Sequence, residues 1–547
     1  MAHVLAGVLL FVAVCGAGLL LAFTAHWQMK RSGHSALPHT DPYVQYMQDK
    51  QSLNILGYAQ QLRRSWNSFG SFSVSFTTMS LYAGAAVYFG AVFSYGGAWS
   101  FSIGWPIVSL FAMLVAAAMS EMASAIPTSG GGYHWAYAAG GKRWAWLTAW
   151  LRGLGDAGLL ILVNWAAAYL IVTMISIRFN YERNTVSVLL FAFLLFAAQT
   201  IVARRGKVLL RLFMQFGAWL QVGLIVVIVV GLAVVIGPNL QPAEYLFSFG
   251  PYGTEKGGLV PVILTLLLLH RLFAGGDAAA HAVEETYNPK VTVPWSIYLT
   301  SVYGFVFGYV LLACIVLASP DIIGFHGDSN AFLALTTGVW GTWNPLMNNL
   351  ILIGILCALW GSGLGCLNSA SRLWFAYHRD ARSGVNRWLA AVTPSRQLPH
   401  RIVVMVGLTC FTAFAALLYI DPWNGNYRQQ LWFLTTWCIL SFNLAYAIPI
   451  GLQMMSKRKS SRFKECFWHL GRLSPMVRLI AFLWLLMTSV ASVLLMDAAA
   501  LVVLGCILAV AGLTGLLNGR LRKCGAKPAA ITSREELLRI ERQYKQL

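Results

Sequence analysis

Two glycines and a carboxylate lie next to each other in a segment that is otherwise apolar enough to cross a membrane. The stretch Ala274–Thr286 reads AGGDAAAHAVEET, with Gly275 and Gly276 directly before Asp277. Glycine loosens a helix because it has no side chain and loses the most backbone freedom when it is ordered. A carboxylate inside a membrane is costly, so its presence points to a function. These residue types predict a broken helix that binds a polar solute.

A second weakened helix lies at the corresponding place in the first half of the chain, where residues 72–97 contain Gly84 and Gly90. Paired broken spans are typical of secondary transporters, in which N–H groups of a half-helix bind a carboxylate and freed carbonyls bind an ammonium group. Close helix packing is the alternative explanation for such glycines. We expect the breaks within residues 77–84 and 273–276. The substrate-binding residues predicted there are Thr77, Thr78, Ser80, Ala83, Gly84, Phe273, Ala274, Gly275 and Gly276.

The composition shows what kind of protein carries these segments. Of the 547 residues, 58% are hydrophobic and 11% are charged, which gives more apolar surface than a soluble core of this length can bury. Apolar runs of about 20 residues, each enough to cross the hydrocarbon core as a helix, follow one another along the chain. The sequence therefore predicts an all-α polytopic membrane protein. Its twelve core spans are 71–97, 102–126, 145–176, 186–203, 209–236, 257–281, 295–319, 345–377, 400–419, 428–453, 476–496 and 498–518.

Basic residues indicate the topology. The net charge of +20 comes mostly from Lys and Arg in alternate connections, as in cytoplasmic loops, so we expect a lipid bilayer and no nucleic acid as partner. Both ends of the twelve-helix unit then face the cytoplasm, from a plasma membrane or an organelle membrane such as that of the vacuole. Around the transporter domain (71–519) we expect a cytoplasmic lead-in (26–70) with a short helix near 53–64, and a cytoplasmic tail (520–547) with a short helix after Ser533.

The first 25 residues are apolar enough to span, yet they lack the basic leader of a signal peptide. An extra transmembrane helix and an interfacial or cleaved segment are both compatible with this pattern. If the segment spans, Lys30 and Arg31 stay in the cytoplasm and the N-terminus lies outside.

The core divides into two runs of five spans, residues 71–236 and 257–453, followed by trailing helices within 476–519. An odd number of spans makes the second run inverted in the membrane. The nine cysteines form no CxxC pair, and the eleven histidines show no metal-ligand spacing. We therefore expect no metal, no cofactor and no enzymatic activity.

At this level of detail the sequence resembles the amino acid/choline transporter family of the amino acid, polyamine and organocation superfamily. The resemblance covers about residues 50–497 and rests on five motifs in order. They are SEMASAIPTSGGGYHW (120–135), AGGDAAAHAVEET (274–286), SRLWFAYHRD (371–380), YAIPI (446–450) and FWHLGRLSP (467–475). It implies two inverted five-helix repeats plus two helices, a substrate site between helices 1, 3, 6 and 8, and alternating access driven by an ion gradient. Family members carry amino acids, γ-aminobutyrate (GABA), choline or polyamines.

The resemblance also implies roles for two aromatic residues. Phe273 stands where the family has a residue that covers bound substrate, and Trp150 on the third helix matches the family pattern there, so we include both in the substrate site. Packing is the alternative for Phe273.

Arg271, Arg152 and Asp156 depart from the neutral residues expected of the family. A rise of 1.5 Å per residue places Arg271 about 20 Å into its helix, near the midplane, and Asp156 roughly 15 Å from the cytoplasmic end. We favour an Asp156–Arg271 ion pair that neutralises buried charge. Alternatively, Arg271 binds a substrate carboxylate, or Asp156 pairs with Arg152 one turn away.

Acids and bases at predicted cytoplasmic helix ends match the family's inner gate, which closes the site to the cytoplasm. Surface solvation is the alternative. For coupling we favour a proton over sodium, because the hydroxyl groups near helices 1 and 8 are weak candidates for a sodium cage. His281 lies one turn from Asp277 and could relay protons or simply pack. The gating and coupling residues predicted are Glu121, Asp156, Arg271, Asp277, His281, Glu284 and Arg372.

These features predict a secondary active transporter for amino acids or related small amines such as GABA or choline. A nutrient sensor with the same fold and little uphill transport is the alternative.

Overall fold

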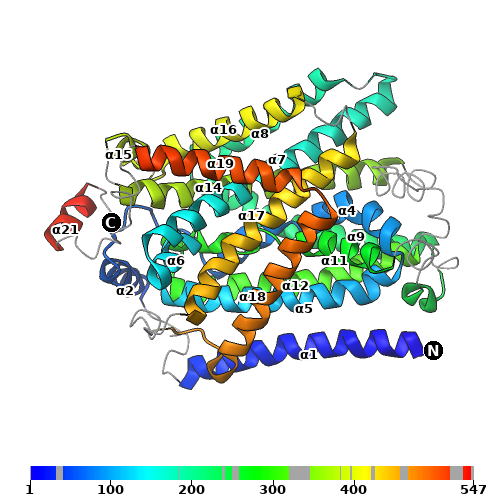
Figure 1. The fold of residues 1–547 in the computed structure, drawn as a ribbon, viewed down its shortest axis with the longest axis horizontal. Coiled ribbons are helices and arrows are strands. Elements are labelled where there is room, and N and C mark those ends of the chain that lie inside the picture. The colour runs from blue at the N-terminus through cyan, green and yellow to red at the C-terminus, as the bar shows by residue number, and fades with distance from the viewer. Residues whose placement is uncertain are drawn as a thin grey trace.

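The computed structural model describes residues 2–31, 41–182, 184–236, 241–248, 258–318, 345–381, 384–394, 397–420, 426–455, 466–517 and 534–543. Within these ranges the chain is helical, and its one strand-like feature is an isolated parallel bridge between Trp66 and Thr286. The long helices lie side by side in one bundle (Figure 1). Eleven of the described helical segments are long and apolar enough to cross a membrane, and α11 and α19 are shorter apolar helices.

Each of the twelve predicted core spans contains a described helix. In the first half they are α3 (Ser68–Met79) with α4 (Leu81–Gly96), η1 (Ser100–Gly104) with α5 (Trp105–Ala125), α7 (Lys142–Phe179), α8 (Thr185–Arg205), α9 (Lys207–Ile236) and α11 (Leu259–Arg271). In the second half they are α12 (Pro289–Leu317), α14 (Pro345–Ala381), α16 (His400–Ile420), α17 (Tyr427–Met455), α18 (Ser474–Leu495) and α19 (Ala499–Leu517).

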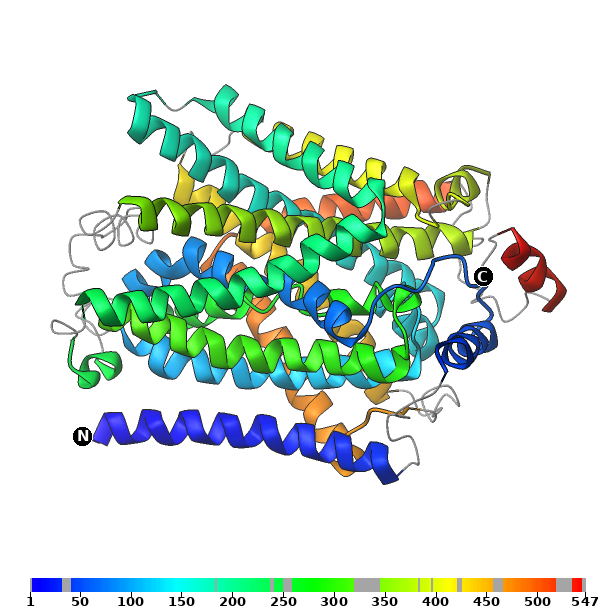
Figure 2. The same cartoon turned by 180° about the vertical axis from the view of Figure 1, so that it is seen from behind.

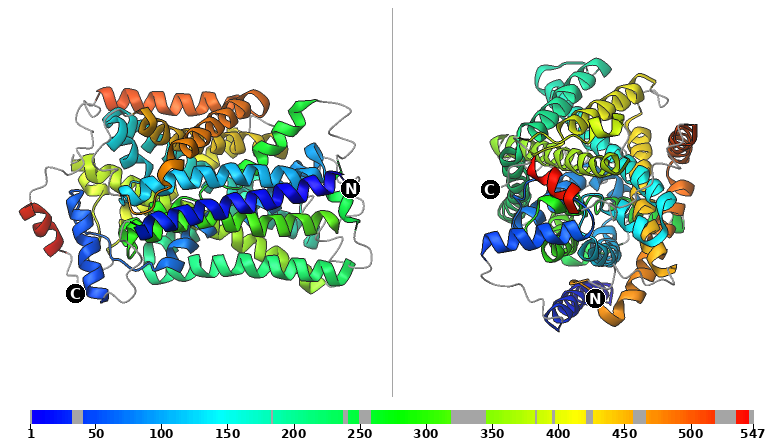
Figure 3. Two further views of the ribbon diagram at one scale, coloured as in Figure 1. Left: turned by 90° about the horizontal axis from the view of Figure 1, so that it is seen from below. Right: turned by 90° about the vertical axis from the view of Figure 1, so that its left-hand side faces the viewer.

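Short elements cover one end of the bundle. Figure 1 shows α2 (Pro42–Ile55), α6 (Gly132–Gly140), α15 (Gly384–Leu389) and α21 (Arg534–Arg542) at the same end, and Figure 3 shows α2 and α21 lying across it. The lead-in helix is therefore Pro42–Ile55, and the prediction of a helix near 53–64 is wrong. Downstream of it, Gly57 has a φ of 87° and the backbone turns toward the bundle. In the tail, α21 agrees with the predicted surface helix, although Ser533 lies outside the described residues.

The N-terminal helix α1 (Ala2–Arg31) runs along the edge of the bundle (Figure 2). Its Phe11 ring contacts Tyr309 of α12 at 4.5 Å, and the Tyr298 hydroxyl donates to the Gly18 carbonyl at 2.6 Å. Gly7 packs against Phe247 of η3 (Ala243–Phe247). Near the other end of α1, Gln28 packs against Gly471 of η8 (Gly471–Leu473). The helix is long and apolar enough to span, as one of the two alternatives for this segment predicts.

The sixth span differs from its prediction in its second half. The α-helix α11 ends at Arg271 and does not continue to residue 281. Gly275 adopts a φ of 85°, which interrupts the helical hydrogen bonds. Two 3₁₀ turns follow, η4 (Ala278–Ala280) and η5 (Val283–Glu285).

Candidate functional site

The first-span break lies at Ser80, inside the predicted range. Ser80 adopts left-handed dihedral angles (φ 44°, ψ 69°), so α3 ends at Met79 and α4 starts at Leu81. Ser80 makes no side-chain cap for α4. The first N–H groups of a helix have no partner within the helix. The start of α4 therefore presents free N–H groups that can bind an anion.

The sixth-span break lies against the first. A Cβ at Gly275 would stand 3.2 Å from Thr78 of α3 and 3.2 Å from Leu159 of α7. On α14, Ser362 donates its hydroxyl to the Thr78 carbonyl at 2.6 Å. The first, third, sixth and eighth core spans, which are α3 with α4, α7, α11 and α14, thus meet at the two breaks. This is the arrangement that the resemblance implies.

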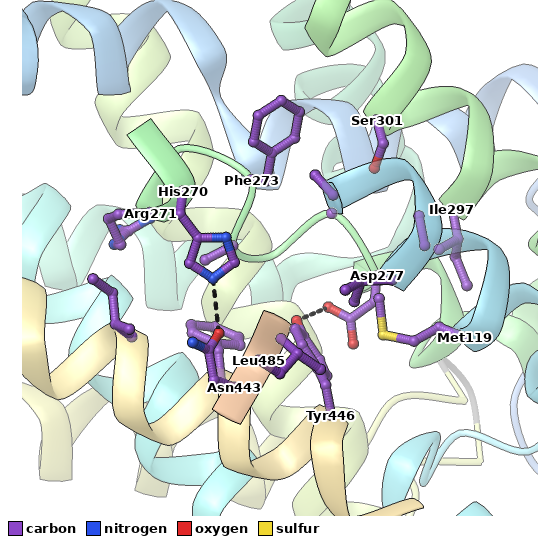
Figure 4. Close-up of a pocket in the computed structure, with 17 residues that line it drawn as sticks. Met119, His270, Arg271, Phe273, Asp277, Ile297, Ser301, Asn443, Tyr446 and Leu485 are labelled. Atoms are coloured by element: carbon purple, nitrogen blue, oxygen red, sulfur yellow. Dashed lines mark hydrogen bonds between the residues drawn. The ribbon is translucent and has the colours of Figure 1, made fainter. Parts of the chain in front are cut away.

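Two small cavities flank the sixth-span break. One of about 40 Å³ is lined by Phe273, Ala274, Gly276, Asp277 and neighbours from α5, α12, α17 and α18 (Figure 4). Another of about 20 Å³ lies beside the first-span break. A buried water needs roughly 10–15 Å³ of cavity volume. The two cavities therefore have room for only a few water molecules. Residues of the first break that line the smaller cavity are Met79, Ser80, Ala83, Gly84, Val87 and Tyr88.

Arg271 lines both cavities. Its side chain is buried, and its Nε has no hydrogen-bond partner among the described residues. Its main electrostatic neighbours are neutral, namely the Tyr88 hydroxyl and the Cys438 and Cys366 thiols, and the Cys438 side chain also forms a hydrogen bond with it. An uncompensated guanidinium in a membrane protein is costly unless an anion neutralises it.

The favoured Asp156–Arg271 ion pair is wrong. Asp156 lies 3.1 Å from Arg152 Nη2, four residues earlier on α7, as the third alternative states. The same Nη2 lies 3.3 Å from Asp277 Oδ1. The prediction rested on the similar depth of Arg271 and Asp156 in the membrane, which does not show which sides of the helices face each other, and Arg152 is close enough to serve both carboxylates.

Tyr446 completes this group. Its hydroxyl donates to Asp277 Oδ1 at 2.7 Å, as the dashed line in Figure 4 marks, and it accepts a hydrogen bond from Arg152 Nη1 at 3.2 Å. The Asp277 carboxylate therefore has the Arg152 guanidinium as its ion-pair partner and the Tyr446 phenol as its hydrogen-bond donor. All the charged members are buried.

His281 joins the group as a neutral imidazole. Arg152 Nε lies 3.1 Å from His281 Nε2, and a guanidinium only donates, so Nε2 must accept. Nδ1 then carries the proton and donates to the Ser129 carbonyl at 3.0 Å. The group is Arg152, Asp156, Asp277, His281 and Tyr446, here called the Arg152 cluster.

A second histidine, His270, lies on the other side of the larger cavity (Figure 4). The Trp484 indole N–H donates to its Nδ1 at 3.2 Å, so its Nε2 carries the proton and donates to Asn443 Oδ1 at 3.0 Å. Asn443 and Tyr446 were not predicted as site residues. Their signal in the sequence is a polar pair one turn apart inside an apolar span, at the start of the YAIPI motif.

The remaining predicted substrate residues have different positions. Phe273 stacks on Trp105 at 4.9 Å and lines the larger cavity. Thr77 and Thr78 donate their hydroxyls to backbone carbonyls, of Met214 and Val74. Trp150 is not brought to the breaks. It contacts Trp374 in a separate cavity behind α7.

The predicted gating acids are buried in ion pairs, so the surface-solvation alternative is wrong. Glu284 receives two hydrogen bonds from Arg379, at 2.9 and 3.0 Å. Glu285 pairs with Arg372 at 2.9 Å. The pairs join the segment after the sixth-span break to α14.

Glu121 holds a different helix pair together. It lies 2.6 Å from Arg478 Nη2 and accepts the Leu470 N–H at 2.9 Å, which links α5 to the start of α18. The partners Arg379 and Arg478 were not predicted, because nothing in the sequence shows which bases face these acids.

The lead-in closes the same end of the site. The N–H groups of Ser65 and Trp66 donate to the Glu285 carbonyl at 2.7 and 3.0 Å, and Gln60 Nε2 donates to the Glu284 carbonyl at 2.9 Å. Burial would raise the pKa of Glu284, but the Arg379 guanidinium and its hydrogen bonds, with a further one from Ser129 N–H, outweigh burial and lower it. Glu284 therefore stays ionised and paired.

Comparisons with known proteins agree with this architecture. The amino acid permease family model matches residues 69–511. An uncharacterised amino-acid permease of Schizosaccharomyces pombe is 25% identical and covers 81% of this chain and 82% of its own. The amino-acid permease BAT1 of Arabidopsis thaliana is 25% identical (80% and 87% covered), and the GABA-specific permease of Saccharomyces cerevisiae is 22% identical (78% and 75%).

The solved structure of MhsT in complex with L-phenylalanine shares the fold. It is 15% identical, with a TM-score of 0.52, and the match covers 78% of this chain and all of that one. A family match over more than three quarters of the sequence, together with the paired breaks, leads to one conclusion: the chain belongs to the amino acid permease family.

Proposed function

We propose that the protein is a secondary active transporter that moves amino acids or related small amines across a membrane by alternating access. The observation that carries this proposal is Arg271, a buried cation that has no ion-pair partner among the described residues and lines both cavities beside two touching helix breaks. The family membership and the relatives named as amino-acid and GABA permeases support it.

The two sides of the sixth-span break carry opposite charge and suggest how a substrate lies. Arg271 and the uncapped start of α4 are suited to a carboxylate. Asp277 borders the same larger cavity and lies apart from Arg271 in Figure 4. Its carboxylate and the carbonyls freed at the break are suited to an ammonium group. A zwitterion that bridges these poles leaves neither charge unpaired.

The Arg152 cluster is suited to proton coupling. One guanidinium faces two carboxylates, and His281 is neutral, so the cluster has room for one further positive charge. A proton on Asp156, Asp277 or His281 would supply that charge and weaken a contact of Arg152. Binding of substrate at Asp277 and of a proton at its partners would then be linked through shared groups.

The bundle end that carries α2 and α21 is placed in the cytoplasm, because the predicted topology puts basic connections there. On that side the ion pairs of Glu284 and Glu285 and the lead-in would form the inner gate. The additional span α1 would then have its N-terminus on the outer side. A plasma membrane or an organelle membrane such as the vacuole's would fit this topology.

Transport in proteoliposomes tests the proposal. Labelled α-amino acids, GABA, choline and polyamines are each offered without a proton gradient, with an inward gradient and with an outward gradient. We expect uphill uptake of at least one substrate with an amino group, driven by one of the two gradients. Binding without uphill uptake of any of them would contradict transport and leave a sensor.

A further inference from the structure

The largest of the described cavities is not at the helix breaks. It has a volume of about 470 Å³ and lies among α7, α14, α16, α17 and α19, with Asn386 of α15 at one end. Cavities of roughly 300–1,000 Å³ are typical of small-molecule sites. Of these helices, α7, α14, α16 and α17 are long and apolar enough to cross a membrane and α19 is a shorter apolar helix, so in a bilayer this part of the bundle would be surrounded by lipid.

One wall of the cavity is aromatic. The rings of Trp146 and Trp150 lie 6.2 Å apart, and Trp150 meets the Trp374 ring edge-on at 5.1 Å. Trp374 packs directly over Gly153, where a Cβ would stand 2.6 Å from its ring, and Ala157 continues the small-residue surface of α7 along the cavity. A flat, rigid, apolar molecule fits such a wall better than a side chain or a water cluster does.

The cavity also changes polarity along its length. On α7 it extends from Trp146 to Ile161, which is about 22 Å at 1.5 Å per residue. Its polar residues lie toward one end, where His378 Nδ1 is 2.7 Å from Asn386 Oδ1. At the other end it is lined by groups such as Ile161 and Trp437. An occupant should therefore have one polar end and a long apolar body.

Two observations define the polar end of the occupant. The described lining contains no Lys, Arg, Asp or Glu, so a phosphate headgroup would have no counter-charge there. The Trp150 indole N–H is buried and has no hydrogen-bond partner among the described residues, and such donors are rare unless a ligand or water completes them. A neutral hydroxyl suits this lining.

We propose that this cavity binds a sterol of the surrounding bilayer, with its hydroxyl at the end where the Trp150 indole N–H, Trp374 and His378 lie together and its ring system extending from there along α7 toward Ile161. The site lies on the face of α7 away from the helix breaks. Gly153 lines it directly after Arg152, whose own side chain reaches the Asp277 carboxylate on the other face. The proposal does not depend on the identity of the transported substrate.

Photolabelling tests the proposal in nanodiscs of phosphatidylcholine that contain a diazirine-bearing cholesterol analogue. We expect labelled peptides from residues 146–161 and 405–413, with labelling suppressed at least about tenfold by excess cholesterol. A matched disc with a diazirine-bearing phosphatidylcholine should label the exposed outer faces instead. Labelling of the cavity by the phospholipid probe, without competition by cholesterol, would overturn the proposal.

A pair of substitutions on α16 adds a second measurement. Ala413→Trp fills the cavity, whereas Leu408→Trp places the same ring on a surface that is 62% exposed. We expect Ala413→Trp to lower cavity labelling about tenfold and Leu408→Trp to leave it unchanged. Equal labelling of the two variants would identify the probe as loosely bound surrounding lipid. If Ala413→Trp does not fold, the competition measurement on the unmodified chain decides alone.

Discussion

The Arg152 guanidinium lies 3.3 Å from the Asp277 carboxylate and so joins α7 to the break in the sixth span. Asp277 belongs to the segment that lines the larger cavity, and Arg152 belongs to a long helix of the bundle. A change of charge at Asp277 therefore alters the ion pairing of α7, a helix that does not itself line that cavity. This contact links the candidate substrate site to the candidate proton site.

Arg152→Gln should damage the protein more than Asp156→Asn. Removal of the cation leaves two buried carboxylates uncompensated, and breaking a buried pair in this way costs about 3–5 kcal/mol. Asp156→Asn leaves Arg152 paired with Asp277. The double variant should recover part of the loss of Arg152→Gln. Thermal unfolding in detergent and transport measure both effects, and additive losses in the double variant would contradict the pairing.

Asp156→Asn and Arg271→Gln should combine additively, because these side chains do not share an ion pair. The measurement is again thermal unfolding of the two single variants and the double variant. If the double variant is less damaged than Asp156→Asn alone, the result would support the direct Asp156–Arg271 pair that the sequence led us to favour.

Arg271→Gln should raise KM without loss of stability. A charge-assisted hydrogen bond contributes about 1.5–3 kcal/mol, so the loss of a carboxylate ligand should raise KM roughly 10- to 150-fold. Stability should stay the same or rise, because an uncompensated buried charge is removed. Arg143→Gln, at an exposed arginine near the start of α7, is the matched control. An unchanged KM in Arg271→Gln would remove Arg271 from the substrate site.

Gly275→Ala should be more harmful than Gly276→Ala. Gly275 has a φ of 85° and little room for a Cβ, whereas Gly276 has no positive φ and its nearest neighbour would be 3.4 Å away. A left-handed conformation costs an L-residue roughly 1–2 kcal/mol, so Gly275→Ala should lower the melting temperature and the transport rate. Similar behaviour of the two variants would show that the backbone there is not held in this conformation.

The Glu284–Arg379 ion pair should persist down to acidic pH. The pKa of Glu284 is lower in the folded chain than in the unfolded one. Its stabilisation is therefore fully present above the unfolded pKa and is lost as the pH falls through the folded pKa. Hydrogen exchange of residues 278–286 should be constant from neutral pH down to the usual carboxylate range, after correction for intrinsic rates, and accelerate only below it.

Glu284→Gln is the matched variant for that measurement. Its exchange should be faster at neutral pH, and the acid-dependent step should disappear. A step that persists in Glu284→Gln would assign the acid response to another group.

The order and type of the helices followed from apolar run length, and both breaks followed from residues that weaken a helix. Ser80 bears this out, because its left-handed backbone separates α3 from α4. In the sixth span α11 ends at Arg271, just before the predicted break, and Gly275 adopts a positive φ within that break. The sequence did not show which side chains form ion pairs with one another. Each successive residue turns a helix by 100°. An error of a few residues in a predicted boundary therefore leaves it undefined which side of α7 faces the helix breaks. For this reason the Asp156 partner was wrong, Trp150 was placed in the substrate site, and Arg379 and Arg478 were missed.

The N-terminal helix has a mechanical consequence. At 30 residues α1 is about 45 Å long, and it touches η3 near its start and η8 near its end. Because α1 is one continuous helix that contacts the bundle near both of its ends, it keeps η3 and η8 at a constant separation. A rearrangement that exposes the breaks first to one side of the membrane and then to the other would therefore have to preserve the distance between η3 and η8.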